Sequence, residues 1–81
     1  MHITVLLFAQ ARDRAGTDRF TLELAEGARV ADALAAIKSQ YPTLEELWPH
    51  LAVAADGVLV DQSAVLHEGA ELALLPPVSG G

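Results

Sequence analysis

The chain of 81 residues contains no cysteine. This absence excludes a disulfide framework, a zinc ribbon, an iron–sulfur cluster held by thiolates and a cysteine nucleophile. Aromatic residues make up only 5% of the chain, so the core of the one domain that this length allows must be mostly aliphatic. If the protein handles sulfur, the sulfur is not carried on a thiol of its own.

Basic residues are also few: five Lys and Arg stand against eleven Asp and Glu, which gives a net charge of −6. Nucleic-acid binding needs clustered positive charge, so we expect no nucleic-acid partner. We expect instead a protein partner whose binding surface is basic or neutral. No apolar run approaches the roughly 18 residues of a membrane span, and no charged-then-apolar signal segment opens the chain. We therefore expect a soluble, cytoplasmic protein without a membrane partner.

Alternating apolar and polar residues predict five short strands. The first strand becomes apolar on both faces toward its end, which is typical of a central strand with a parallel neighbour. The expected strands cover residues 3–8, 19–24, 51–55, 58–60 and 71–75. Asp56-Gly57, between the third and the fourth, is a two-residue hairpin signal.

One long helix is expected from Val30 to Gln40, because apolar residues recur along it at i, i+4 and i+7. Pro42 would stop this helix. The sequence Thr-x-x-Glu from Thr43 to Glu46 has the pattern of a capping box and predicts a brief second helix that ends at Pro49.

Residues 9–15 have a helix-forming composition and favour a short helical turn that ends at Gly16 in a left-handed cap. The order strand, strand, helix, strand, strand, strand with a single long helix indicates an α+β fold. We expect a mixed sheet of four to five strands packed on one main helix, which is the β-grasp or ubiquitin-like architecture.

The sequence contains no recognisable enzyme active site. His2, His50 and His67 fall on separate elements without a metal-ligand spacing, so we expect surface or turn histidines and no metal site. The serines lack a neighbouring base with an orienting partner, and the glycines do not form a phosphate-binding loop.

Large apolar side chains exceed what one helix can cover. Phe8, Leu59 and Leu75 are the candidates for an exposed patch on the sheet face that has no helix, and such a patch marks a partner-binding surface. In the alternative, a shift of register by one residue turns Phe8 or Leu75 into the core.

The chain ends in Pro76-Pro77-Val78-Ser79-Gly80-Gly81. The two prolines restrict the backbone and donate no N–H, so they end the last strand and begin an extended segment. The two glycines give the thinnest possible end, which can enter a narrow channel and present its carboxylate there. The alternative is a frayed terminus without function.

Four segments of the chain resemble a known family: Leu7–Arg12, Val30–Leu34, Asp56-Gly57 and, most specifically, Leu75–Gly81. Together they are similar to the small subunit of molybdopterin synthase, the MoaD family of ubiquitin-like sulfur carriers, along the whole length. The sequence departs from the family pattern at position 56, where asparagine is usual. It also departs at Ala70, where an acidic residue is common and its loss could weaken a charged partner contact.

The resemblance implies a sulfur-donating subunit of molybdopterin synthase with no active site of its own and no permanently bound cofactor. A ubiquitin-activating-type enzyme would use ATP to form an acyl-adenylate on Gly81, and a sulfur donor protein would convert it to a thiocarboxylate. Its ionised sulfur is a nucleophile, as a thiolate is.

In this scheme residues 1–75 form the β-grasp domain and residues 76–81 the tail. The family pattern implies that the tail, from Pro76 to Gly81, enters the large synthase subunit, with Pro76–Ser79 as partner-binding residues and Gly80 next to Gly81 at the reacting end. There the sulfur passes to the cyclic pterin monophosphate during molybdenum cofactor biosynthesis. Two sulfurs are needed per product, which fits a heterotetramer with two carriers.

Two alternatives stay open. A related ubiquitin-like carrier would serve thiamine synthesis, tRNA thiolation or cysteine synthesis, and a protein modifier would be joined to lysines through Gly81. In a different class, the chain would be an interaction domain with an inert tail.

Overall fold

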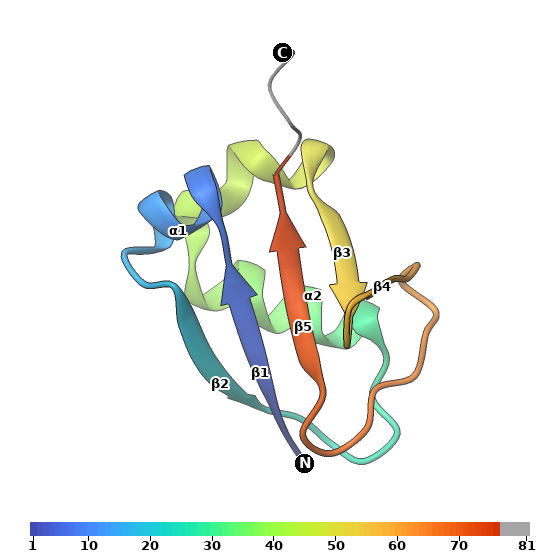
Figure 1. The fold of residues 1–81 in the computed structure, drawn as a ribbon. Helices are drawn as coiled ribbons and strands as arrows, with labels where there is room; N and C mark the ends of the chain where they lie inside the picture. The colour runs from blue at the N-terminus through green and yellow to red at the C-terminus, as the bar shows by residue number, and fades with distance from the viewer. Residues whose placement is uncertain (77–81) are drawn as a thin grey trace.

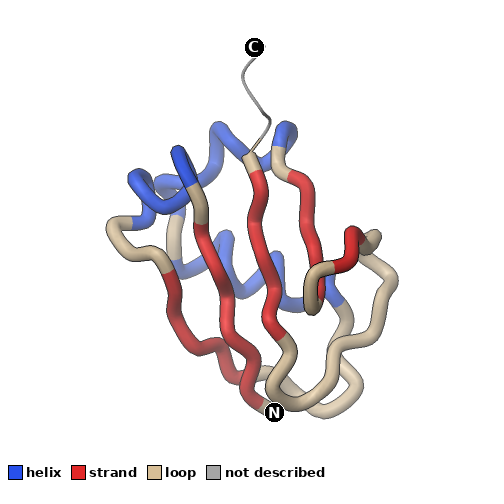
Figure 2. The backbone as a smooth tube through the Cα atoms, viewed as in Figure 1, coloured by secondary structure: helices blue, strands red, loops and turns tan. Residues whose placement is uncertain are grey.

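The computed structural model describes residues 1–76, and its elements follow the predicted order. They are β1 (His2–Leu7), α1 (Ala9–Ala15), β2 (Arg19–Glu23), α2 (Val30–Gln40), the 3₁₀ helix η1 (Pro42–His50), β3 (Ala52–Ala55), β4 (Val58–Leu59) and β5 (Glu71–Leu75). The strands form one sheet, and the helices lie behind it on one side (Figures 1 and 2).

The sheet has the strand order β2-β1-β5-β3-β4. β1 and β5 are parallel neighbours in the middle, and the other pairings are antiparallel. The prediction of a central first strand with a parallel partner is therefore confirmed, as is the mixed α+β sheet on one main helix.

The core lies between the sheet and α2. β1 contributes every second residue, and α2 contributes a stripe at helical spacing, so each element buries one side. The largest fully buried side chains are Ile3, Val5, Leu7, Val30, Ile37, Leu44, Leu72 and Leu74. The aliphatic core expected from the composition is confirmed.

The predicted turns have the backbone angles that their residues favour. Gly16 caps α1 at φ 79°, and its N–H donates to the carbonyl of Arg12 at 2.9 Å. At the β3–β4 hairpin, Asp56 and Gly57 have φ of 51° and 84°, which is the left-handed pair that such a turn requires.

The second helix differs from its prediction. It begins at Pro42, not at Thr43, and its N-terminus has no side-chain cap. Proline is tolerated in a first helical turn because its missing N–H would have no partner there. The Thr43 hydroxyl instead donates to the carbonyl of Arg14 at 2.7 Å, so the capping box was a wrong prediction. Pro49 lies inside η1, which continues to His50.

Within residues 1–76, no helix is both long enough and apolar enough to cross a membrane.

Candidate functional site

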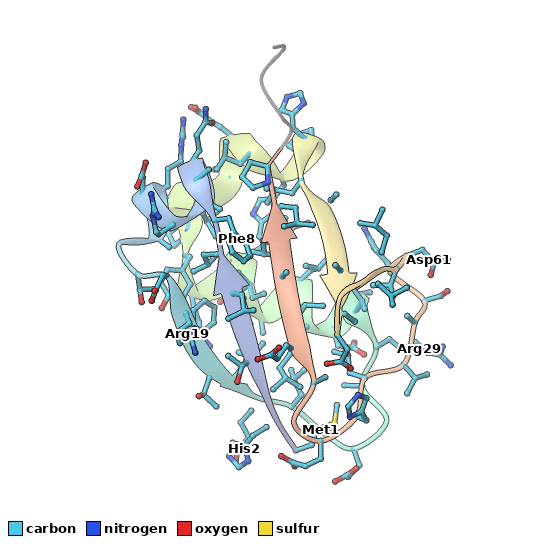
Figure 3. The ribbon with its side chains drawn as sticks, in the orientation of Figure 1. Met1, His2, Phe8, Arg19, Arg29 and Asp61 are labelled. Atoms are coloured by element: carbon cyan, nitrogen blue, oxygen red, sulfur yellow. The ribbon has the colours of Figure 1, made fainter. Side chains whose placement is uncertain are left out.

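The face of the sheet turned away from α2 carries a continuous row of side chains. Directly paired residues of neighbouring strands lie on the same face. The row that runs across all five strands consists of Arg19, Leu6, Ala73, Ala54 and Leu59. Four of these five are apolar, and the cation stands at the β2 edge (Figure 3).

A second row lies toward the end of β5, where Leu75 pairs with Ala52. Leu7 pairs with the buried Leu74, and Phe8 follows in an extended conformation with φ −127° and ψ 152°. Because side chains alternate along extended backbone, Phe8 lies on the same face as Leu6 and Leu75. This whole side of the sheet is called the open face.

The structure brings the three predicted patch residues together on this open face. Phe8 is 45% exposed and Leu59 is 69% exposed, while Leu75 is half-buried. The alternative register, with Phe8 or Leu75 in the core, does not occur.

Sequence reasoning missed Leu6, Ala54 and Ala73, which share this face. A signal for Leu6 was present, because β1 is apolar on both sides. The two alanines gave none, since their role depends on which strands lie beside them. Ala54 is buried although it does not belong to the core cluster.

Polar side chains replace the apolar ones toward the start of β1. Thr4 pairs with Thr21 and with Glu71 on this face, and His2 pairs with Glu23. The His2 Nε2 and the Glu23 Oε2 are 3.2 Å apart. The open face is therefore apolar near the end of β5 and polar at the opposite end.

The predicted tail begins where the apolar part of the open face ends. β5 stops at Leu75, and Pro76 follows as a half-buried residue. The other predicted tail residues, Pro77, Val78, Ser79, Gly80 and Gly81, lie outside the described residues. The central strand thus leads from the open face directly toward the tail.

The two departures from the family pattern differ in their consequences. Ala70 has no exposed surface, so the weakened charged contact considered for position 70 is not a feature of this surface. Asp56 does more than form the turn: its Oδ1 accepts the N–H of Glu71 at 3.0 Å, and its Oδ2 lies 2.7 Å from the His67 Nε2.

All three histidines are exposed, as predicted. Within the part of the chain that the structure describes, no three or more His, Asp or Glu side chains are grouped in a way that could hold a metal ion.

Comparison with known proteins assigns the family. The model of the ThiS family matches residues 5–81, which include the terminal diglycine. The chain belongs to the ThiS family.

Two relatives of this family member carry the name molybdopterin synthase sulfur carrier subunit. The protein of Chlamydomonas reinhardtii is 37% identical, with all of both chains covered. The protein of Arabidopsis thaliana is 35% identical over all of this chain and 84% of its own length.

Two solved structures are similar over all of both chains. Small archaeal modifier protein 1 of Haloferax volcanii has a TM-score of 0.91 at 31% identity. A chain in the complex of subunits 1 and 2 of the molybdopterin-converting factor from Helicobacter pylori has a TM-score of 0.74 at 28% identity. The ubiquitin-like β-grasp fold is thereby confirmed.

Proposed function

We propose that this ThiS-family chain is the sulfur carrier subunit of molybdopterin synthase. The observation that carries the proposal is the continuity of β5, which contributes Ala73 and Leu75 to the open face and leads through Pro76 into the diglycine tail. A partner that binds the open face therefore lies against the strand from which the tail continues in the sequence. The full-length similarity to carriers of that name supports the same function.

The chemistry takes place on the terminal carboxylate, which is a poor acyl donor until it is activated. A carboxylate oxygen of Gly81 attacks the α-phosphorus of ATP, pyrophosphate leaves, and an acyl-adenylate forms. A sulfur nucleophile at the oxidation level of hydrosulfide then attacks the carbonyl carbon, and AMP leaves as the carbon–oxygen bond breaks. The product is a thiocarboxylate, whose ionised sulfur is the nucleophile for the next transfer.

The proposed acceptor is the cyclic pterin monophosphate, held in the large synthase subunit. That subunit would cover the open face, because removing exposed apolar side chains such as Phe8 and Leu59 from water lowers the free energy of the complex. The Helicobacter pylori structure, a complex of subunits 1 and 2, supports such an assembly. Two sulfurs per product favour two carriers in one heterotetramer.

The activating enzyme would use the same face at an earlier step. Within residues 1–76, the open face is the apolar surface that lies next to the start of the tail, so the two enzymes would bind in turn and not together. Because activation consumes ATP, we place the carrier in the cytoplasm, together with the activating enzyme and a sulfur donor protein.

A second candidate function is favoured by one observation, the similarity to small archaeal modifier protein 1. A modifier would pass the activated Gly81 carbonyl to a lysine amine and leave an isopeptide bond. Digestion of cellular proteins would then release lysines that carry a remnant of the tail, whereas a pure carrier leaves none.

The test of the carrier function is the intact mass of the protein after incubation with ATP, the activating enzyme and a sulfur source. We expect a rise equal to the replacement of one oxygen by one sulfur, absent when Gly81 is deleted. Adding the large subunit and the pterin precursor should return the mass to its starting value. A mass that never changes would reject the carrier function.

A further inference from the structure

The surroundings of His67 indicate which protonation form the structure requires. Its Nδ1 lies 2.9 Å from the backbone carbonyl of Glu68, and its Nε2 lies 2.7 Å from the carboxylate of Asp56. A carbonyl and an ionised carboxylate can only accept hydrogen bonds, so both ring nitrogens must donate. Only the protonated imidazolium satisfies both contacts, because a neutral ring has one nitrogen without a hydrogen.

Asp56 connects this ring to two further segments. Its Oδ1 accepts the N–H of Glu71 at 3.0 Å, and its own N–H donates to the Glu71 carbonyl at 2.8 Å. The turn between β3 and β4 is thus tied to the start of β5 and to the loop that precedes it. The group formed by His67, Asp56 and the backbone of Glu71 is called the clamp.

The loop side of the clamp is itself fixed to β1. The Glu68 carboxylate accepts the backbone N–H of His2 at 3.1 and 3.2 Å, and the Gly69 N–H donates to the His2 carbonyl at 2.8 Å. The loop therefore gives His67 a firm base, while Asp56 on the hairpin side is held by the Glu71 backbone and by His67.

The contact with His67 adds to few other restraints on β4, which is short and lies at the sheet edge. It consists of Val58 and Leu59, which are 65% and 69% exposed, so core packing holds them only slightly. A backbone hydrogen bond from the Val60 N–H to the Val53 carbonyl, 3.0 Å long, also crosses the hairpin.

Leu59 pairs with Ala54, and Val58 pairs with Ala55, which directly precedes Asp56. Asp56 and the open-face residue Leu59 are thus only three residues apart in one hairpin. A displacement of Asp56 therefore also displaces Leu59.

We infer that His67 is a positioning residue: its protonated ring, bound to Asp56, helps to hold the β3–β4 hairpin so that Leu59 stands in place on the open face. Loss of the proton removes one ring hydrogen bond and the charge attraction to Asp56, and thereby loosens the hairpin. The statement about the hairpin is independent of any partner. Its consequence for docking rests on the proposed function.

The direction of the pH dependence follows from the hydrogen bonds. The bond to Asp56, and then that to the Glu68 carbonyl, raise the pKa of His67, while the N–H of Glu71 and then His67 lower the pKa of Asp56. The contribution of His67 is complete below the pKa of a free histidine and is lost as the pH rises through its raised value. The contribution of Asp56 is present above the pKa of a free aspartate and is lost as the pH falls through its lowered value.

The clamp is therefore closed between the lowered pKa of Asp56 and the raised pKa of His67. The other titratable groups on the segments packed around the clamp are Glu68, Glu71 and His2. Since His67 and Asp56 are both exposed, we expect a local effect on the hairpin and little change in global stability.

The experiment is an NMR pH titration of the free carrier, following the His67 ring protons and the amides of Gly57, Leu59 and Glu71. These amides should titrate with the midpoint of the His67 ring. In Asp56→Asn the ring midpoint should fall. In Asp13→Asn, which removes an equal charge from α1, it should not change.

Two substitutions of His67 separate protonation from mere occupancy of the site. His67→Gln should abolish the high-pH transition of the Gly57 and Leu59 amides. His67→Arg, a permanent cation, should keep both amides at their low-pH positions throughout. The inference would be overturned if the chemical shifts of these amides did not change as the His67 ring titrates, or if they changed in the same way in His67→Gln.

The docking consequence is measured as the affinity for the large subunit below and above the His67 transition. Between these two pH values, wild type should lose several-fold more affinity than His67→Arg. Because His67→Arg keeps its charge, its own loss of affinity measures the contribution of titrating groups on the partner. An equal loss in both proteins would reject the docking consequence. Failure to bind at any pH would reject the proposed function, while the NMR titration of the free carrier still decides the inference about the hairpin.

Discussion

At the scale of single residues, Leu59 is the sharpest test of the open face. It lies on a two-residue strand, is 69% exposed and extends a row of apolar side chains that reaches the middle of the sheet. A side chain in this position contributes little to folding but loses its contact with water when a partner covers it.

We predict that Leu59→Glu weakens binding to the large subunit by about tenfold or more, because a buried apolar anchor of an interface is worth about 1–2 kcal/mol or more. The melting temperature should change little. Isothermal titration calorimetry and thermal unfolding measure the two effects.

The matched control is Val65→Glu, since Val65 is 57% exposed but lies outside the open face. Equal losses of affinity in both variants would show that added negative charge, not the open face, is responsible. Unfolding of Leu59→Glu would mean that Leu59 belongs to the core.

At the C-terminus, we predict that Gly81→Ala folds normally and loses most sulfur transfer. A methyl group at the terminal residue would obstruct passage of the tail into the proposed partner site and would crowd the carbonyl carbon at which adenylation and sulfur attack are proposed to occur. Thermal unfolding and turnover in a reconstituted synthase provide the measurements. Turnover equal to that of wild type would refute the role of the tail.

At the scale of elements, η1 packs against α1 and α2. Leu44 and Leu47 of η1 are buried in the core, and the Lys38 ammonium of α2 lies 5.2 Å from the centre of the Trp48 ring. A 3₁₀ helix has poorer hydrogen-bond geometry than an α-helix, so its position depends on this packing.

We predict that Leu44→Ala lowers the free energy of unfolding by about 2–5 kcal/mol, the usual range for truncation of a buried leucine. Urea unfolding followed by circular dichroism measures the change. Glu45→Ala, one residue along on the exposed side of η1, should stay within about 0.5 kcal/mol of wild type. Similar values for the two variants would mean that η1 contributes no packing energy.

At the scale of the whole molecule, the net charge of −6 favours encounter with a basic partner surface. Opposite charges accelerate diffusional encounter, and dissolved salt screens that attraction. Arg19, at the β2 edge of the open face, is one of only five basic residues in the chain, so the overall field is negative.

We predict that the rate of association with the activating enzyme and with the large subunit falls about tenfold or more between about 0.01 M and 1 M salt, as the Debye length shrinks from about 30 Å to about 3 Å. The dissociation rate should change much less. Stopped-flow measurements separate the two rates. An association rate that is independent of salt would mean that the partner surface is neutral.

Local signals in the sequence account for most of the fold. The i, i+4, i+7 stripe placed α2 at Val30–Gln40, and Gly16 and Asp56-Gly57 marked turns, because helix periodicity and left-handed backbone are properties of neighbouring residues. The start of η1 was predicted incorrectly because the Thr43 hydroxyl found a partner in Arg14, 29 positions away, which no local pattern contains.

The candidate site was predictable only in part. The exposure of Phe8 and Leu59 could be argued from an excess of large apolar residues. The clamp was not predicted, because His67 and Asp56 are separated by eleven positions in the sequence. The residues next to each of them indicate only an ordinary turn.

The sequence by itself determined the identity of the elements, the aliphatic core, the absence of thiol chemistry and the family to which the tail belongs, since these depend on composition and on residues close together in the chain. Only the tertiary structure decided that Phe8, Leu75 and Leu59 share one face, and that His67 must be protonated to bind both Glu68 and Asp56. The physical reason is that strand register and hydrogen-bond partners are set by pairings between distant segments, and one residue of slippage would turn every side chain of a strand to the opposite face.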